Sequence, residues 1–115
     1  MAKEPKEIDI FDIDSKNAEI RKEQEKRRSR EIDDLQKVLR SPEGRRFVWR
    51  VLSEAGVFKA SFSLNSMQTS FNEGKRDVGI WLMSDVDRAE PNAYAQMQRE
   101  YYSELKSKQS KQEEE

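Results

Sequence analysis

The chain has 115 residues, the size of one small domain. Charged residues make up 39% of it and hydrophobic residues only 34%, so we expect part of the chain to stay outside any hydrophobic core. The 22 basic and 23 acidic residues nearly cancel, and the absence of both Cys and His excludes a zinc finger, a Cys–His or Ser–His nucleophile and a disulfide framework. No apolar run reaches the roughly 18–20 residues of a membrane-spanning helix. We therefore expect no cofactor, no metal site and no membrane span.

The first predicted segment, residues 1–14, is acidic and flexible. It carries five acidic residues against two lysines, and among them lies an apolar cluster of Ile8, Ile10, Phe11 and Ile13. Two interpretations of this cluster stay open. It is either a docking peptide or a frayed terminus whose hydrophobic residues lean on the rest of the domain.

A helix is predicted from Ser15, a good N-cap, to Arg40, because this stretch lacks Gly and Pro and is rich in good helix formers. Residues 21–31 contain no apolar residue, so residues 15–31 should form a charged, solvated helix. The stripe that can pack begins at Ile32 and continues through Leu35, Val38 and Leu39. We place the helical core domain at residues 32–105.

A second helix should begin at Pro42, with Ser41 as its cap, and stop at Gly56 in a left-handed conformation. Its predicted core face is Phe47, Val48, Val51, Leu52 and Ala55, and Trp49 falls off this face. Residues 57–64 alternate apolar and polar side chains, but a single strand has no partner here. We therefore expect an extended, partly buried connection.

Asn65 and Ser66 are suitable caps for a third helix. Its predicted face is Met67, Phe71, Gly74, Val78, Trp81 or Leu82, and Val86, and Gly74 is expected at a close crossing with another helix. After Pro91 a fourth helix places Tyr94, Met97, Tyr101 and Leu105 on one face. Residues 106–115 should be an acidic disordered tail. The predicted fold is all-α: a small bundle of about three packed helices, with a long charged N-terminal helix and disordered ends.

Candidate functional residues are mostly basic. Asp85 and Asp87, two apart on a helix, face different directions and do not make a paired-acid site, so we expect no enzymatic activity. One basic run consists of Lys26, Arg27, Arg28 and Arg30. This run is interpreted as a solvated face, a protein contact or a nucleic-acid contact. A second basic set consists of Arg45, Arg46, Arg50, Lys75 and Arg76. It should either pair with Glu54, Glu73 and Asp77 or form a common positive surface.

Residues 44–52, 55–58 and 71–82 resemble a family of small tailed-bacteriophage proteins whose named representative comes from a Bordetella podophage. The shared pattern is a GRRF-x-W helix, an aromatic linker and an F-x-EG-x-R-x-x-G helix, and it covers about Leu35 to Tyr102. Its matched positions are Gly44, Arg45, Arg46, Phe47, Trp49, Glu73, Gly74, Arg76 and Gly79. Genes of this family typically lie in the head-morphogenesis cluster, near the capsid and portal genes.

The resemblance implies a non-enzymatic bacteriophage virion or head-assembly accessory protein that acts through protein–protein contacts. Its partners would be other phage structural proteins, at the head or portal, or further copies of itself, and its location the virion and the host cytoplasm during assembly. The alternative is a phage DNA-binding protein that uses its basic helix faces. The residues expected to bind a partner are Arg45, Arg46, Trp49, Arg50, Arg76 and Trp81. For Trp49 a second interpretation stays open, in which the linker 57–64 folds back and covers Trp49 and Ile80.

Overall fold

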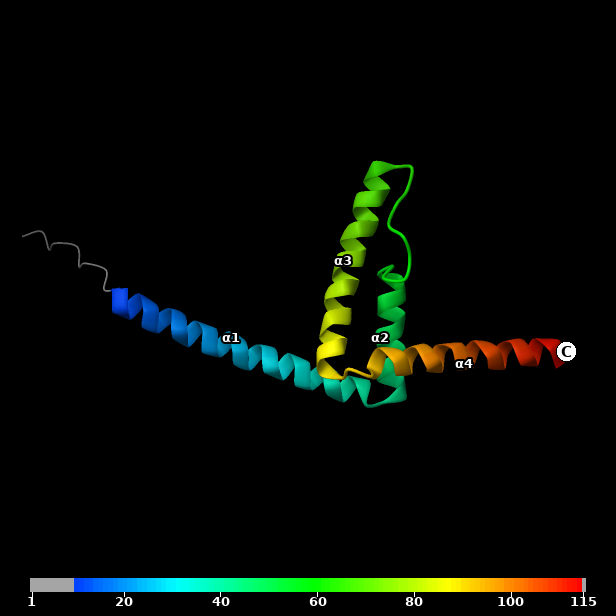
Figure 1. Ribbon diagram of the computed structural model, residues 1–115, viewed down its shortest axis with the longest axis horizontal. Coiled ribbons are helices and arrows are strands. Elements are labelled where there is room, and N and C mark those ends of the chain that lie inside the picture. The colour runs from blue at the N-terminus through cyan, green and yellow to red at the C-terminus, as the bar shows by residue number, and fades with distance from the viewer. Residues whose placement is uncertain (1–9, 115) are drawn as a thin grey trace, which may run out of the picture. The chain divides into compact units, whose positions relative to one another are not determined.

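The computed structural model describes residues 10–114, which form four α-helices and no strand (Figure 1). The helices are α1 (Ile10–Leu39), α2 (Pro42–Glu54), α3 (Ser66–Ala89) and α4 (Ala93–Glu114). The all-α class is therefore confirmed, with four helices in all. The chain divides between Glu31 and Ile32 into two units, and each is described by itself.

The first unit is the solvated part of α1. Every described side chain from Ile10 to Arg27 is exposed, and the Arg28 guanidinium pairs with the Glu31 carboxylate at 3.1 Å, one turn away. The predicted start of this helix at Ser15 is wrong, because α1 already begins at Ile10. No Gly or Pro breaks residues 10–15, and Asp12 in the first turn favours the positive end of the helix dipole. The rest of the predicted flexible segment, residues 1–9, lies outside the described residues.

The junction between α1 and α2 is a tight turn. The Ser41 hydroxyl accepts a hydrogen bond from the Gly44 amide at 3.0 Å, and Pro42 occupies the first turn, as predicted. A side chain at Gly44 would collide with the backbone carbonyl of Val38, so this position needs glycine. At the other end of α2, Gly56 has a φ of 77°, the predicted left-handed stop.

The core lies in the second unit, where α2 packs against both α3 and α4. Its buried hydrophobic residues are Leu39, Val48, Leu52, Val86, Ala89, Ala93 and Met97. Helices α2 and α3 run antiparallel side by side (Figure 1). The core occupies only one end of this pair, since α3 contributes its C-terminal half.

Two predicted core faces are confirmed only in part. On α2 the buried positions are Arg45, Val48 and Leu52, which turns the helix so that Phe47 is 55% exposed. On α3 the buried face runs through Gly79 and Val86, whereas Met67, Phe71, Val78 and Trp81 of the predicted face are exposed. Val48 and Leu52 of the predicted α2 face and Val86 of the predicted α3 face are buried as expected, and Leu82 packs partly buried against the core.

The linker 57–64 is not a strand, and its polar groups fasten it to α3. The Ser63 amide donates to the Thr69 hydroxyl at 2.8 Å, and the Asn72 side-chain amide donates to the Ser61 carbonyl at 3.3 Å. Val57 packs partly buried against the core, but Phe62 and Leu64 stay exposed. The expected extended, partly buried connection therefore describes only the first part of the linker.

The predicted disordered tail after Leu105 is also wrong, because α4 continues as a helix through Glu114. Tyr101 packs on the Trp49 ring, and the side chains from Tyr102 to Glu113 are exposed. Its Glu, Lys and Gln residues are good helix formers, and Lys108 pairs with Glu104 at 3.7 Å across one turn.

The glycine at the helix crossing is Gly79 and not Gly74. A Cβ at Gly79 would collide with a methyl of Val57 and lie 2.7 Å from the Cβ of Ala55, whereas a Cβ at Gly74 would meet nothing within 4 Å. The close approach therefore occurs where α3 passes the C-terminal end of α2.

Gly79→Ala should lower the free energy of unfolding, because an overpacking cost of about 1–3 kcal/mol outweighs a helix-propensity gain of about 1 kcal/mol. Gly74→Ala is the matched control, and it should leave stability unchanged or raise it by up to about 1 kcal/mol. Urea unfolding followed by circular dichroism measures both. Equal effects of the two substitutions would contradict the assigned crossing.

Candidate docking surface

Arg45 is a structural residue, although it belongs to the predicted partner-binding set. The residue is 9% exposed, and its guanidinium binds the Glu100 carboxylate of α4, with Nη2–Oε1 at 2.9 Å and Nε–Oε1 at 3.0 Å. Its Nη1 also donates to the Leu39 carbonyl at 2.9 Å, at the end of α1. All three guanidinium nitrogens are thus engaged within the fold. The salt bridge reaches Glu100 and not the acids expected from sequence.

Trp49 is likewise part of the folded unit. Its ring lies 4.9 Å from Phe58, 5.3 Å from Tyr101 and 6.0 Å from Tyr94, measured between centroids. This aromatic cluster joins α2, the linker and α4, and a hollow of about 810 Å³ opens beside it. The sequence left two interpretations of Trp49 open, and the structure shows the second for this residue, because Phe58 of the linker covers its ring. The linker does not cover Ile80, which is 44% exposed.

Arg46 and Arg76 lie apart from each other. Arg46 is exposed, and its guanidinium lies 3.9 Å from the carboxylate of Glu43, one turn earlier. Arg76 is half-buried beside the linker, where it helps line a hollow of about 470 Å³. Its Nε has no hydrogen-bond partner among the described residues. The two arginines do not form one positive surface.

Arg50 borders a shallow apolar groove between α2 and α3, which we call the α2–α3 groove. The groove measures about 380 Å³ and is lined by Arg50, Val51, Glu54, Ala55, Lys75 and Val78. Its two cations each lie over an aromatic ring of their own helix. The Arg50 guanidinium is 5.3 Å from the Phe47 ring centroid, and the Lys75 ammonium is 5.6 Å from that of Phe71.

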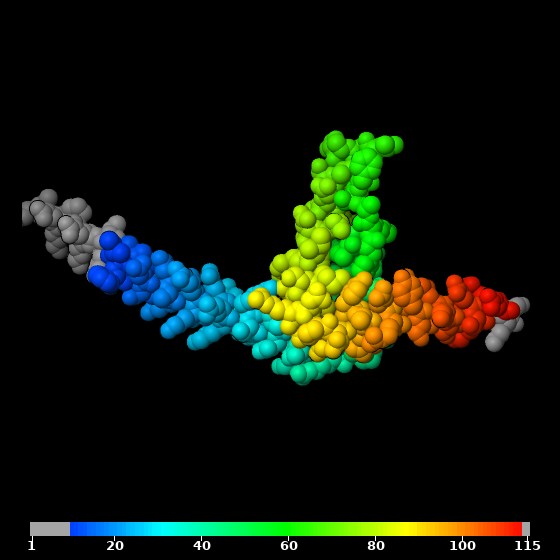
Figure 2. Space-filling model, in the orientation of Figure 1, coloured from blue at the N-terminus to red at the C-terminus, as the bar shows by residue number. Residues whose placement is uncertain are grey.

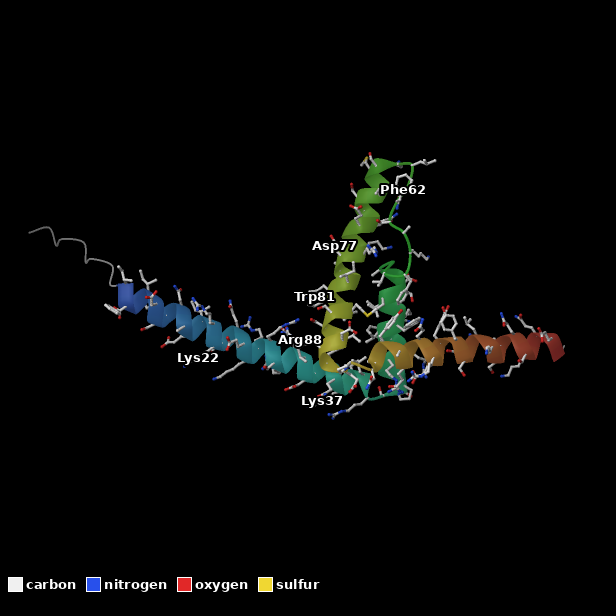
Figure 3. The ribbon with its side chains drawn as sticks, in the orientation of Figure 1. Lys22, Lys37, Phe62, Asp77, Trp81 and Arg88 are labelled. Atoms are coloured by element: carbon white, nitrogen blue, oxygen red, sulfur yellow. The ribbon has the colours of Figure 1, made fainter. Side chains whose placement is uncertain are left out.

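A second apolar surface follows α3. We call it the α3 stripe, and it consists of Met67, Phe71, Gly74, Val78 and Trp81. Met67 is 81% exposed and Trp81 58%. Alternating steps of four and three residues keep these positions on one side of the helix, and Trp81 lies on the side of α3 away from α2 (Figure 3). The N-terminal half of α3 also stands clear of α4 (Figure 2).

The basic run proposed as a nucleic-acid contact lies in the first unit, on α1. Lys26, Arg27 and Arg30 are exposed there, while Arg28 is half-buried and paired with Glu31. Acidic side chains follow at Glu31, Asp33 and Asp34. The run therefore has carboxylates within helical reach.

The acidic residues singled out from the sequence lie apart. No group of three or more acidic side chains among residues 10–114 is placed to hold a metal ion. Asp85 is buried and Asp87 exposed, so these two carboxylates do not face one space. Over the same residues, no helix is apolar enough over a sufficient length to cross a membrane.

Sequence reasoning missed the groove because it assigned the apolar lining residues Val51, Ala55 and Val78 to the core. A signal was present in the pattern of α3, where two sets of positions keep helical spacing. One set begins at Met67 and the other includes Gly79, Val86 and Ala89. A helix with two such sets has more apolar surface than one core seam can cover.

Comparison with known proteins gives one match. A protein-family model described as Bbp19-like phage protein matches residues 35–99. This span includes α2, α3, the linker and both surfaces defined above. Nothing among the curated proteins and nothing among the solved structures matches the chain.

Arg45→Ala should lower the free energy of unfolding by about 1.5–3 kcal/mol, because it breaks buried hydrogen bonds to a charged partner. Arg46→Ala, at the next position but exposed, should change it by less than about 0.5 kcal/mol. Arg45→Lys should restore only part of the loss, since an ammonium cannot replace the forked guanidinium contact. Chemical denaturation measures all three, and a stable Arg45→Ala protein would show that this contact is dispensable.

Proposed function

Since the chain belongs to the Bbp19-like phage proteins, we propose that it is a non-enzymatic accessory protein of phage head assembly that acts by binding another phage structural protein. This function requires a surface that remains available after the chain has folded.

The α3 stripe is the observation that carries the proposal. Four large apolar side chains lie in one row, each more than half exposed, on a helix whose opposite side already packs in the core. A contiguous exposed apolar patch of this kind is typical of a protein interface. Trp81 adds an aromatic anchor, which is the residue type that dominates binding energy at such interfaces.

The spacing of the α3 stripe favours a helical partner. Steps of four and three residues are those of a coiled-coil seam, in which side chains of one helix enter holes of the other. Gly74 lies in the middle of the stripe with open space above it, so a partner helix can approach the backbone closely at this point. We therefore expect the partner to contribute an amphipathic helix with bulky apolar residues.

The double variant Met67→Ser/Trp81→Ser should remove the protein from assembling heads without unfolding it, because both side chains are exposed. In a phage that supplies only this variant, the protein-to-capsid ratio in purified heads, measured by mass spectrometry, should fall at least about tenfold. Its melting temperature should match that of the unsubstituted protein.

Ile80→Ser is the matched control, because it removes an exposed apolar side chain from the same helix but off the α3 stripe. It should leave incorporation unchanged. Normal incorporation and normal head yield with the double variant would overturn the proposal. A steep loss of DNA binding with rising salt, with incorporation intact, would favour the phosphate-binding alternative instead.

A further inference from the structure

We propose that the α2–α3 groove of one copy binds the acidic apolar segment 10–14 of another copy, so that the protein associates head to tail with itself. This contact depends on the two cations of the groove, Arg50 and Lys75, which lie outside the α3 stripe, although Val78 borders both surfaces. It requires only the chain itself, so it is tested without a phage partner.

The groove has the chemistry of a site for an acidic amphipathic segment. Val51, Ala55 and Val78 provide its apolar part, while Arg50 and Lys75 supply two cations from opposite helices. Within residues 10–114 neither cation has a carboxylate within ion-pair distance, and each lies over an aromatic ring. Glu54 is the one acidic residue of the lining, so the groove keeps a net positive charge.

Residues 10–14 have the complementary chemistry. Ile10 is 71% exposed, Phe11 82% and Ile13 41%, within the first turns of α1. Asp12 and Asp14 are exposed beside them, and residues 1–14 as a whole carry five acidic residues against two lysines. Ile10 and Ile13 lie one turn apart on one face. The segment therefore offers two apolar anchors and two carboxylates to a groove with an apolar floor and two cations.

The fit corresponds to a known mode of recognition, in which an amphipathic helix places its apolar face in a hydrophobic groove. Opposite charges around the contact set its orientation and speed its formation. Because the groove and the segment are different surfaces of one chain, the contact is heterologous, and repeated contacts build rings or open chains. The association should weaken with salt, since the ion pairs would lie at the rim.

Sedimentation velocity of the full chain over about 1–200 µM tests the proposal. The unsubstituted protein should form oligomers that dissociate as salt rises. Arg50→Glu/Lys75→Glu reverses the groove and Asp12→Lys/Asp14→Lys reverses the segment. In each variant like charges face one another, so the dissociation constant should rise at least about tenfold. All four side chains are exposed, so circular dichroism should show unchanged helicity.

Mixing the two reversed variants gives the sharpest result. The acidic groove of one then meets the basic segment of the other, and the unchanged groove of the second meets the unchanged segment of the first, so association should return. Arg46→Glu/Lys59→Glu, with the same change in net charge outside the groove, should associate normally. Three results would overturn the proposal: an unsubstituted protein that is monomeric, a reversed variant that associates normally, or a mixture that stays monomeric. None of these results depends on incorporation into heads.

Discussion

The second unit depends on the Arg45 guanidinium, which joins three helices at one point. It neutralises the Glu100 carboxylate of α4 and satisfies the carbonyl of Leu39 at the end of α1, while its own backbone belongs to α2. A carbonyl in the last turn of a helix has no partner within that helix, and a buried one is costly unless something donates to it. The Arg45 side chain thus donates to an otherwise unpaired carbonyl of α1 and fixes where α4 crosses α2.

That crossing decides where the aromatic residues meet. With α4 held against the first turns of α2, Tyr94 and Tyr101 reach the Trp49 ring, and the linker returns to place Phe58 on it. The cluster and the buried residues of the core lie near one end of the antiparallel α2–α3 pair. The core is small, with seven buried hydrophobic residues among those described, so it cannot cover the far half of α3.

The apolar residues of that uncovered half are what the protein has available for binding. The α3 stripe presents a coiled-coil spacing with an open glycine at its centre, while the α2–α3 groove presents apolar side chains between two cations. The α3 stripe suits a contact with a helix, and the α2–α3 groove suits a contact with an acidic segment. The proposed contact with a phage partner and the proposed self-association therefore use these two surfaces.

Local signals in the sequence were enough to predict that four helices form and where α2 begins and ends. Ser41, Pro42 and Gly56 act through their own backbone geometry, so the bounds of α2 follow from neighbours within a few residues. The lack of apolar residues from 21 to 31 likewise leaves that stretch of α1 nothing to bury. The family resemblance rested on a motif, GRRF-x-W and its companion helix, that the family match at residues 35–99 confirms.

Only the tertiary structure decided which of two helical faces is buried and which charges are paired. Phe47 and Val48 are adjacent, and helical spacing alone allows either to be buried. The contact of Arg45 with Glu100 fixes the rotation of α2 about its axis, so that Val48 is buried and Phe47 is exposed. Gly74 and Gly79 are equally unfavourable in an isolated helix, and only the passage of Ala55 and Val57 shows that Gly79 is the one under steric constraint. Periodicity records that a helix has an apolar face, but a helix with two faces needs a packing partner to choose between them, and that partner is distant in the sequence.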